Sequence, residues 1–182
     1  LKYTEHFHPN IISLEHAEEI VQQALNYTLD TNAFKDLVAD YKNSPHARLC
    51  PTIIVFENIH KLISRPNILD SADLNYLNPM IKMVDSRKQY DRWQGQQRDD
   101  STTSERIFTQ HQFHLYAIGE LHKAGVPLIC GTDAGIGVTL PGYSIHQELT
   151  FYHEAGLSPF EVLRTATWEP AQSHRFLNDQ GS

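Results

Sequence analysis

The amino-acid sequence predicts an α/β fold in which a parallel sheet is covered by helices. Three short apolar, strand-like runs occur at 11–16, 48–56 and 126–133, with the sequences IISLEH, RLCPTIIVF and VPLICGTD. Each run is followed by one or more segments with apolar residues at helical spacing. Repeated strand-then-helix units are typical of parallel sheets with helices packed outside them. In such folds the chemistry gathers at the carboxyl ends of the strands.

Length and charge limit the classes of protein to consider. The chain has 182 residues, 40% of them hydrophobic, which is enough for one sizeable core, so we expect a single domain over 1–182. The formal net charge of -7 argues against nucleic acid and anionic membranes as partners. No apolar run approaches the roughly 18 residues of a spanning helix. The cytoplasm is the favoured compartment, and the opening LKYTEHFHPN resembles a helix end, which predicts a natural start further upstream.

The spacing of apolar residues predicts six helical segments. They cover 17–29, 32–43, 73–93, 106–125, 144–156 and 158–168. The last begins with Ser158 as N-cap, Pro159 at the first helical position and Glu161 three residues after the cap. The polar stretch 94–106 is expected to be an exposed loop. The whole connection between the second strand and the 106–125 helix is long, so it could form a lid over a site.

Two of the predicted strands end in residues that can bind a metal ion. Glu15 and His16 end the first strand, and Asp133 ends the third. Neighbouring strand ends would bring His16 and Asp133 together although 133 - 16 = 117 positions separate them. An imidazole and a carboxylate suit zinc or a similar divalent ion. The glycines at 131, 135 and 137 would let the chain around Asp133 approach a ligand closely.

Several motifs in fixed order resemble the metal-dependent amidohydrolases. GTDAG, HQEL, AGLSPFEVLRTAT and EPAQ resemble the last strand and closing helices of this superfamily, in particular the branch with imidazolonepropionase and the prolidase-like dipeptidases. IISLEHAEEI resembles the sixth strand, and CPTIIVF the seventh. The resemblance runs from about Ile11 to Ser182. It implies a partial TIM-type (β/α)8 barrel, with three βα units that correspond to strands 6 to 8.

The resemblance also implies roles for two residues. His16 falls on the sixth-strand histidine, which binds metal or substrate, and Asp133 on the eighth-strand aspartate, which binds metal and acts as general base. The implied activity is hydrolysis of amide bonds in dipeptide-like or cyclic amide substrates. The implied cofactor is one or two divalent ions in the parent protein, with zinc as the expected metal. A divalent ion lowers the pKa of a bound water to about 7, and a carboxylate can complete the proton transfer.

Other features of the family have no counterpart in this sequence. The first-strand His-x-His pair, the fourth-strand lysine and the fifth-strand histidine are absent, and His6 and His8 lie too close to the sixth-strand match to replace them. With only His16 and Asp133 present, we expect the chain alone to be inactive, because catalytic zinc sites usually need three protein ligands. Open sheet edges would favour self-association. The alternative is a metal-free binding or assembly module that keeps the fold.

The remaining candidates have weaker support. Tyr143 and Arg65 could contact a substrate carboxylate from loops. Structural roles are favoured for six further residues. His111 and His114 lie on a predicted helix face, His146 and Glu148 near a predicted helix start, and Cys50 and Cys130 in strand-like runs. Glu15 could orient His16, but adjacent strand residues point to opposite faces.

Overall fold

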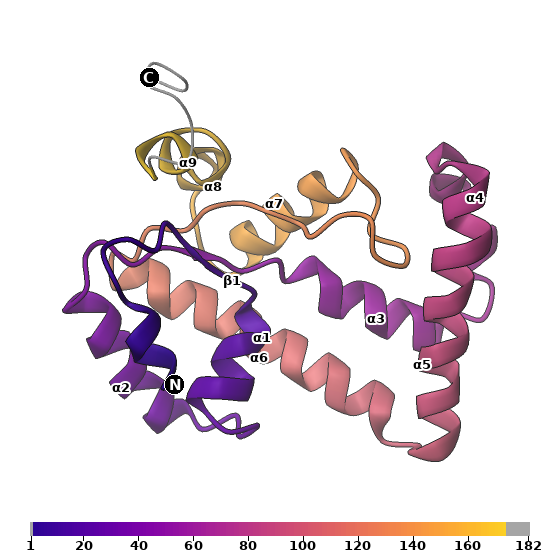
Figure 1. Cartoon of the computed structure of the whole chain (residues 1–182), viewed down its shortest axis with the longest axis horizontal. Coiled ribbons are helices and arrows are strands. Elements are labelled where there is room, and N and C mark those ends of the chain that lie inside the picture. The colour runs from indigo at the N-terminus through magenta and orange to yellow at the C-terminus, as the bar shows by residue number, and fades with distance from the viewer. Residues whose placement is uncertain (1, 174–182) are drawn as a thin grey trace.

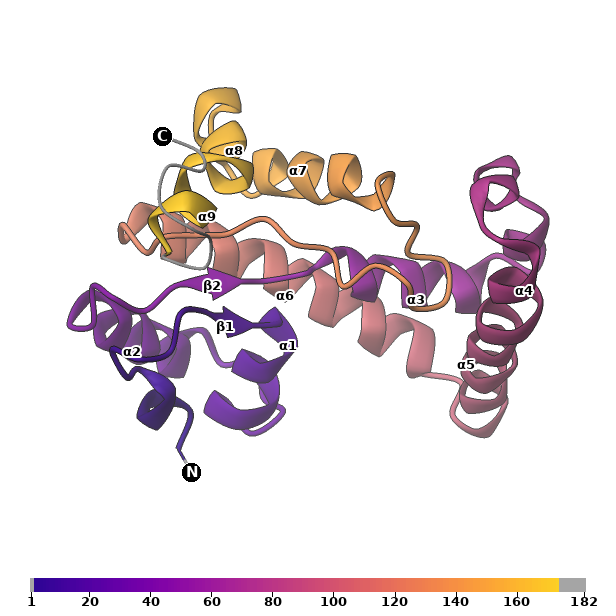
Figure 2. The ribbon, with the colours of Figure 1, turned by 45° about the horizontal axis from the view of Figure 1, so that its top comes forward.

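The structure is a computed structural model that describes residues 2–173. The described part is mostly helical, with 63% of its residues in helices. Within the described residues the sheet has two parallel strands, β1 (Leu14–Glu15) and β2 (Leu49–Cys50). The predicted partial TIM-type barrel is therefore wrong. The three predicted strand runs do lie side by side, because Leu49 also forms a parallel bridge with Leu128, but they do not build a larger sheet (Figure 2).

The strands are short because their sequences leave the extended conformation early. After β2 the chain reaches Pro51, which has no amide hydrogen for a ladder, and Thr52, whose φ is 47°. Ile53 is already in helical conformation, so the β-branched residues 53–55 begin α3 (Ile54–Ser64) instead of extending the strand. Tertiary contacts override the β-propensity of this run.

Most of the predicted helical ranges are helical in the structure, although α3 lies outside all of them. Around β1 lie a short 3-10 helix (Tyr3–His6), α1 (Ala17–Glu19) with its π-helical continuation (Ile20–Ala24), and α2 (Thr31–Lys42). Two short 3-10 turns follow α3 (Ile68–Asp70 and Ala72–Tyr76). The second half of the chain contains α6 (Thr103–Lys123), α7 (Ser144–Glu154), α8 (Pro159–Ala166) and α9 (Trp168–Gln172). The predicted capping box at Ser158 and Glu161 is present.

A long helical rod stands at one end of the molecule (Figure 1). It consists of α4 (Pro79–Ile81), a π-helical turn (Lys82–Ser86) and α5 (Arg87–Asp99). The expected loop over 94–106 is wrong, because only 100–102 leave the helical conformation. The Gln94 side-chain amide donates to the carbonyls of Leu62 and Ile63 at the end of α3, at 2.8 and 3.0 Å. The hydropathy of residues 94–99 does not predict a helix, but these contacts between Gln94 and α3 stabilise the helical conformation there.

The main hydrophobic core surrounds α6. Ile118 and Leu121 of α6 are fully buried, as are Phe34 of α2 and Tyr152 of α7. A smaller cluster lies under the rod and includes Leu62, Leu74, Val138 and Leu140, with Trp93 packed against it. The helices within residues 2–173 include none that is both long and apolar enough to cross a membrane.

Candidate functional site

The structure brings His16 and Asp133 together. His16 follows β1 directly, and Asp133 follows the extended segment that contains Leu128. Their closest side-chain atoms, Nε2 of His16 and Oδ2 of Asp133, are 4.0 Å apart, and each side chain is 38% exposed. The backbone amide of His16 donates to the carbonyl of Cys50 in β2 at 2.8 Å, so the pairing of the strands itself positions the histidine.

An unusual backbone conformation occurs where each extended segment ends. His16, Thr52 and Asp133 have φ values of 67°, 47° and 50°. Positive φ is uncommon for residues other than glycine and costs conformational energy. Such strain persists only where surrounding structure imposes it, and it clusters at functional sites. The sequence predicts two of these three residues, His16 and Asp133, as metal ligands, so strain and ligand chemistry coincide at this end of the strands.

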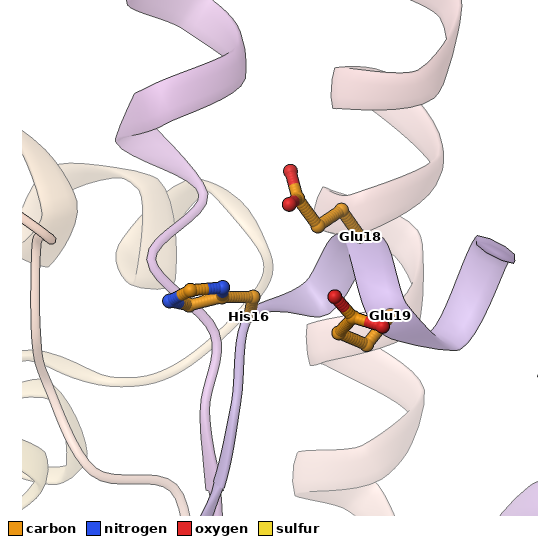
Figure 3. Close-up of side chains that lie close together, drawn as sticks. All are labelled: His16, Glu18 and Glu19. Carbon is orange, nitrogen blue, oxygen red and sulfur yellow. The ribbon is translucent and has the colours of Figure 1, made fainter. Parts of the chain in front are cut away.

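Two further carboxylates lie beside His16 that the sequence analysis missed. Figure 3 shows Glu18 and Glu19 on the first turn of α1, next to the imidazole of His16. Ligand atoms of these three residues all lie within 4.8 Å of one another. Burial raises the pKa of Glu18, the nearby charges of Glu19 and Asp133 raise it further, and His16 opposes the rise. The positions of both glutamates just after a strand-end histidine, in the first turn of a helix, could have indicated them.

The donor set suits a divalent ion, and its ligand atoms lie near the spacing that such an ion requires. Zinc binds nitrogen and oxygen ligands at about 2.0–2.2 Å in a tetrahedral arrangement, so two ligand atoms of one ion lie roughly 3.4 Å apart. The separation of 4.0 Å between His16 and Asp133 is longer than this, so the two side chains would move closer together to share an ion. The ligand atoms of His16, Glu18 and Glu19, which lie within 4.8 Å of one another, would do the same. Imidazole with carboxylates is a donor set that fits zinc.

A cavity of 370 Å³ opens beside Glu18 and Asp133, which line one part of it. Gln22, residues of α3 and α5, and residues 136–139 of the loop after Asp133 line the rest. The apolar contributors are aliphatic and aromatic: Val55, Phe56, Ile59, Leu62, Trp93, Ile136 and Val138. The lining thus combines apolar side chains with polar and charged groups, and small-molecule sites use such polar groups to orient a ligand. The helix α5 thus forms a wall of the cavity, close to where the sequence predicts a lid.

The loop that follows Asp133 is attached to the rod. The amide of Gly137 donates to Oδ2 of Asp85 at 2.9 Å, and the hydroxyl of Ser86 donates to the carbonyl of Gly137 at 2.5 Å. Gly137 has a φ of 59°, which glycine adopts without strain. On the α3 side, the amide group of Asn58 donates to the hydroxyl of Thr139 at 3.0 Å. These bonds connect the position of Asp133 to two helices.

Other predicted site residues lie elsewhere. Tyr143 and Arg65 line a separate, smaller cavity of 110 Å³ that does not include Asp133. His146 is exposed on α7. Glu15 accepts a hydrogen bond from Ser13 at 2.6 Å, and its charge acts on the Cys50 thiol. The structure therefore brings together His16 and Asp133 but adds neither Tyr143 nor Arg65 to them.

The buried polar residues have structural surroundings, as predicted. The carboxylate of Glu148, on α7, accepts hydrogen bonds from the amides of Ile53 and Ile54 at 3.0 and 2.8 Å, at the start of α3. Burial raises the pKa of Glu148 to about 8, although the two amides oppose this rise. His111 and His114 lie on α6 and are buried. His114 packs against Phe56 of α3 and His111 against Phe151 of α7, and burial lowers the pKa of both imidazoles.

Both cysteines are free thiols. Cys50 is buried and Cys130 is half-buried. Burial raises the pKa of the Cys130 thiol to about 12, which leaves it protonated and unreactive at neutral pH. The thiols therefore provide packing, in agreement with the sequence.

No family model matches this chain, and neither a curated protein nor a solved structure matches it.

Proposed function

We propose that this chain forms part of a metal-dependent amidohydrolase that hydrolyses amide bonds in dipeptide-like or cyclic amide substrates. The observation that supports the proposal most directly is the approach of His16 to Asp133, at 4.0 Å, from positions far apart in the sequence. The strained φ values of both residues and the cavity beside them add to it. The order of sequence motifs that resemble this superfamily supplies the reaction type.

The roles of the residues follow from their chemistry. His16 would hold a divalent ion through an imidazole nitrogen, with Asp133 and Glu18 as carboxylate ligands. A bound divalent ion supplies a water that is activated at neutral pH. Asp133 would accept a proton from the attacking water and return it to the nitrogen that leaves when the amide bond breaks. The products are a carboxylic acid and an amine, which balances the atoms of the amide and one water.

The chain alone is proposed to be inactive. The family that the sequence resembles also uses metal-site residues from its first, fourth and fifth strands, and this sequence has no counterpart of them. His16, Glu18 and Asp133 are therefore proposed to form only part of the full ligand set. Further ligands would come from outside this chain, and the natural full-length protein that carries the sequence is the species expected to hydrolyse amides.

Zinc affinity tests the proposed ligands. The purified chain is titrated with zinc in competition with a chromophoric chelator, next to the variants His16→Gln and Asp133→Asn. Each variant should weaken binding by about tenfold or more, a change of about 1.4 kcal/mol. His146→Gln and Asp36→Asn serve as matched controls, because both residues are exposed and lie outside the cavity.

Hydrolysis is then measured on the natural full-length protein with a panel of dipeptides and cyclic amides. Asp133→Asn should abolish it. Equal zinc affinity in all variants, or undiminished hydrolysis by Asp133→Asn, would remove the proposed role of Asp133. Absence of metal binding in both the chain and the full-length protein would favour the metal-free binding or assembly module instead.

A further inference from the structure

The cavity that Glu18 and Asp133 line also contains an arginine that has no ionic partner among the described residues. Arg92 and Trp93, both on α5, line the cavity together with Glu18 and Asp133. The guanidinium carbon of Arg92 lies 5.2 Å from the centre of the Trp93 ring, in a cation–π arrangement. Within residues 2–173 no carboxylate lies within ion-pair distance of Arg92, although Arg87, Arg106 and Arg164 each have one.

Trp93 gives this arginine a fixed platform. The indole is half-buried and packs against two apolar clusters, one with Leu62 and one with Phe56. A stacked guanidinium keeps its N–H groups at the ring edge, in the fork geometry that binds carboxylates by two hydrogen bonds. The same cavity therefore contains the carboxylates of Glu18 and Asp133 and the guanidinium of Arg92, and α3 extends from the strand ends towards α5, the helix that carries Arg92 (Figure 1).

We propose that Arg92, stacked on Trp93, binds a carboxylate of the ligand, and that the cavity accepts an apolar amide with a free carboxylate at the end remote from His16 and Asp133. This inference rests on the proposed function for the reaction, but the binding that it describes needs no metal. The negative charges of Glu18 and Asp133 would repel a carboxylate, so the charge distribution of the cavity determines the direction in which such a ligand binds. Val55, Ile59 and Leu62 would contact its apolar part.

Fluorescence of Trp93 provides a direct test. The chain has two tryptophans, so Trp168→Phe leaves Trp93 as the reporter. This variant is titrated in the presence of a chelator with N-acetyl-leucine, which carries a carboxylate, and with N-acetyl-leucinamide, which is neutral. N-acetyl-leucine should bind about tenfold more tightly, as expected for a charge-assisted hydrogen bond to guanidinium.

The variant Arg92→Gln should remove this preference. Arg92 is exposed, so the substitution leaves the core intact. Arg98→Gln is the matched control, since Arg98 lies on the same helix, is also exposed and does not line the cavity; it should keep the tenfold preference. Equal affinity for the two probes, a preference that persists in Arg92→Gln, or no change of Trp93 fluorescence would each overturn the proposal. Because a chelator is present, these results are separate from the metal and hydrolysis experiments.

Discussion

Single buried polar residues connect the helices of this protein, and His114 shows the effect on stability. Its side chain is 1% exposed, and burial lowers the pKa of the imidazole to about 3. The Nδ1 atom has no hydrogen-bond partner within the described residues. The unfolded chain binds a proton at His114 near pH 6.5 and the folded chain does not, so stability falls as the pH decreases from 6.5 towards 3.

The variant His114→Leu should reduce this acid sensitivity. Relative to pH 7, the wild-type chain should lose about 3 kcal/mol of unfolding free energy at pH 4 through this residue, and the variant should not. At pH 7 the two should differ by about 1 kcal/mol or less, because the substitution removes a buried polar group that lacks one partner. Urea unfolding at both pH values measures the difference. The same pH dependence in both proteins would show that His114 is not held neutral.

Glu148 is the second buried polar residue with a specific structural role. Both carboxylate oxygens accept amide hydrogens at the start of α3, so Glu148 caps that helix from α7. In Glu148→Gln the side-chain NH₂ would face one of these amides, so at pH 9, above the pKa of about 8 at which Glu148 ionises, we expect destabilisation of about 2–3 kcal/mol. Glu154→Gln, on the same helix but exposed, should change stability by less than about 0.5 kcal/mol. Thermal unfolding compares them, and equal melting temperatures would exclude the capping role.

The packing of whole helices depends on Gly119. A Cβ atom at this position of α6 would lie 2.5 Å from the backbone carbonyl oxygen of Ala155, just after α7. Backbone cannot rotate away as a side chain can, so Gly119→Ala should separate α6 from α7 and cost about 1–3 kcal/mol. Gly95→Ala in α5 is the opposite case, because its Cβ would meet only the flexible end of Arg98 at 3.7 Å.

The same substitution should therefore have opposite effects in two helices. Gly95→Ala should stabilise the chain by up to about 1 kcal/mol through helix propensity. Chemical denaturation of both variants tests the pair. Destabilisation by Gly95→Ala, or no effect of Gly119→Ala, would contradict the packing described for these helices.

At the scale of the whole molecule, the proposed metal site links β1 to the segment around Leu128. A ligand that binds only the folded state raises its stability by mass action, by about 2.7 kcal/mol at a concentration one hundred times Kd. Zinc should therefore raise the melting temperature of the wild-type chain, and the rise should be smaller in Asp133→Asn. Scanning calorimetry with and without zinc tests this expectation. An equal rise in both proteins would place the ion elsewhere.

Sequence reasoning succeeded where the signal was local. The capping box at Ser158 and the amphipathic helix around Ile118 depend on residues within a few positions, and the structure has both. The predicted strand at 53–56 and the predicted loop at 94–99 are both wrong, because contacts with distant residues decide the conformation there. Glu148 holds the start of α3, and Gln94 holds α5 against the end of α3.

The candidate site shows the same division. The sequence by itself determined that the three strand-like runs lie parallel and next to one another. It also determined that His16 and Asp133, at the ends of two of these runs, lie close together. Only the tertiary structure decided that the sheet stops at two strands, that Glu18 and Glu19 join His16, and that α5 brings Arg92 and Trp93 to the cavity. The physical reason is that local propensity and spacing act over a few residues, whereas the length of a strand and the walls of a cavity depend on packing between segments far apart in the chain.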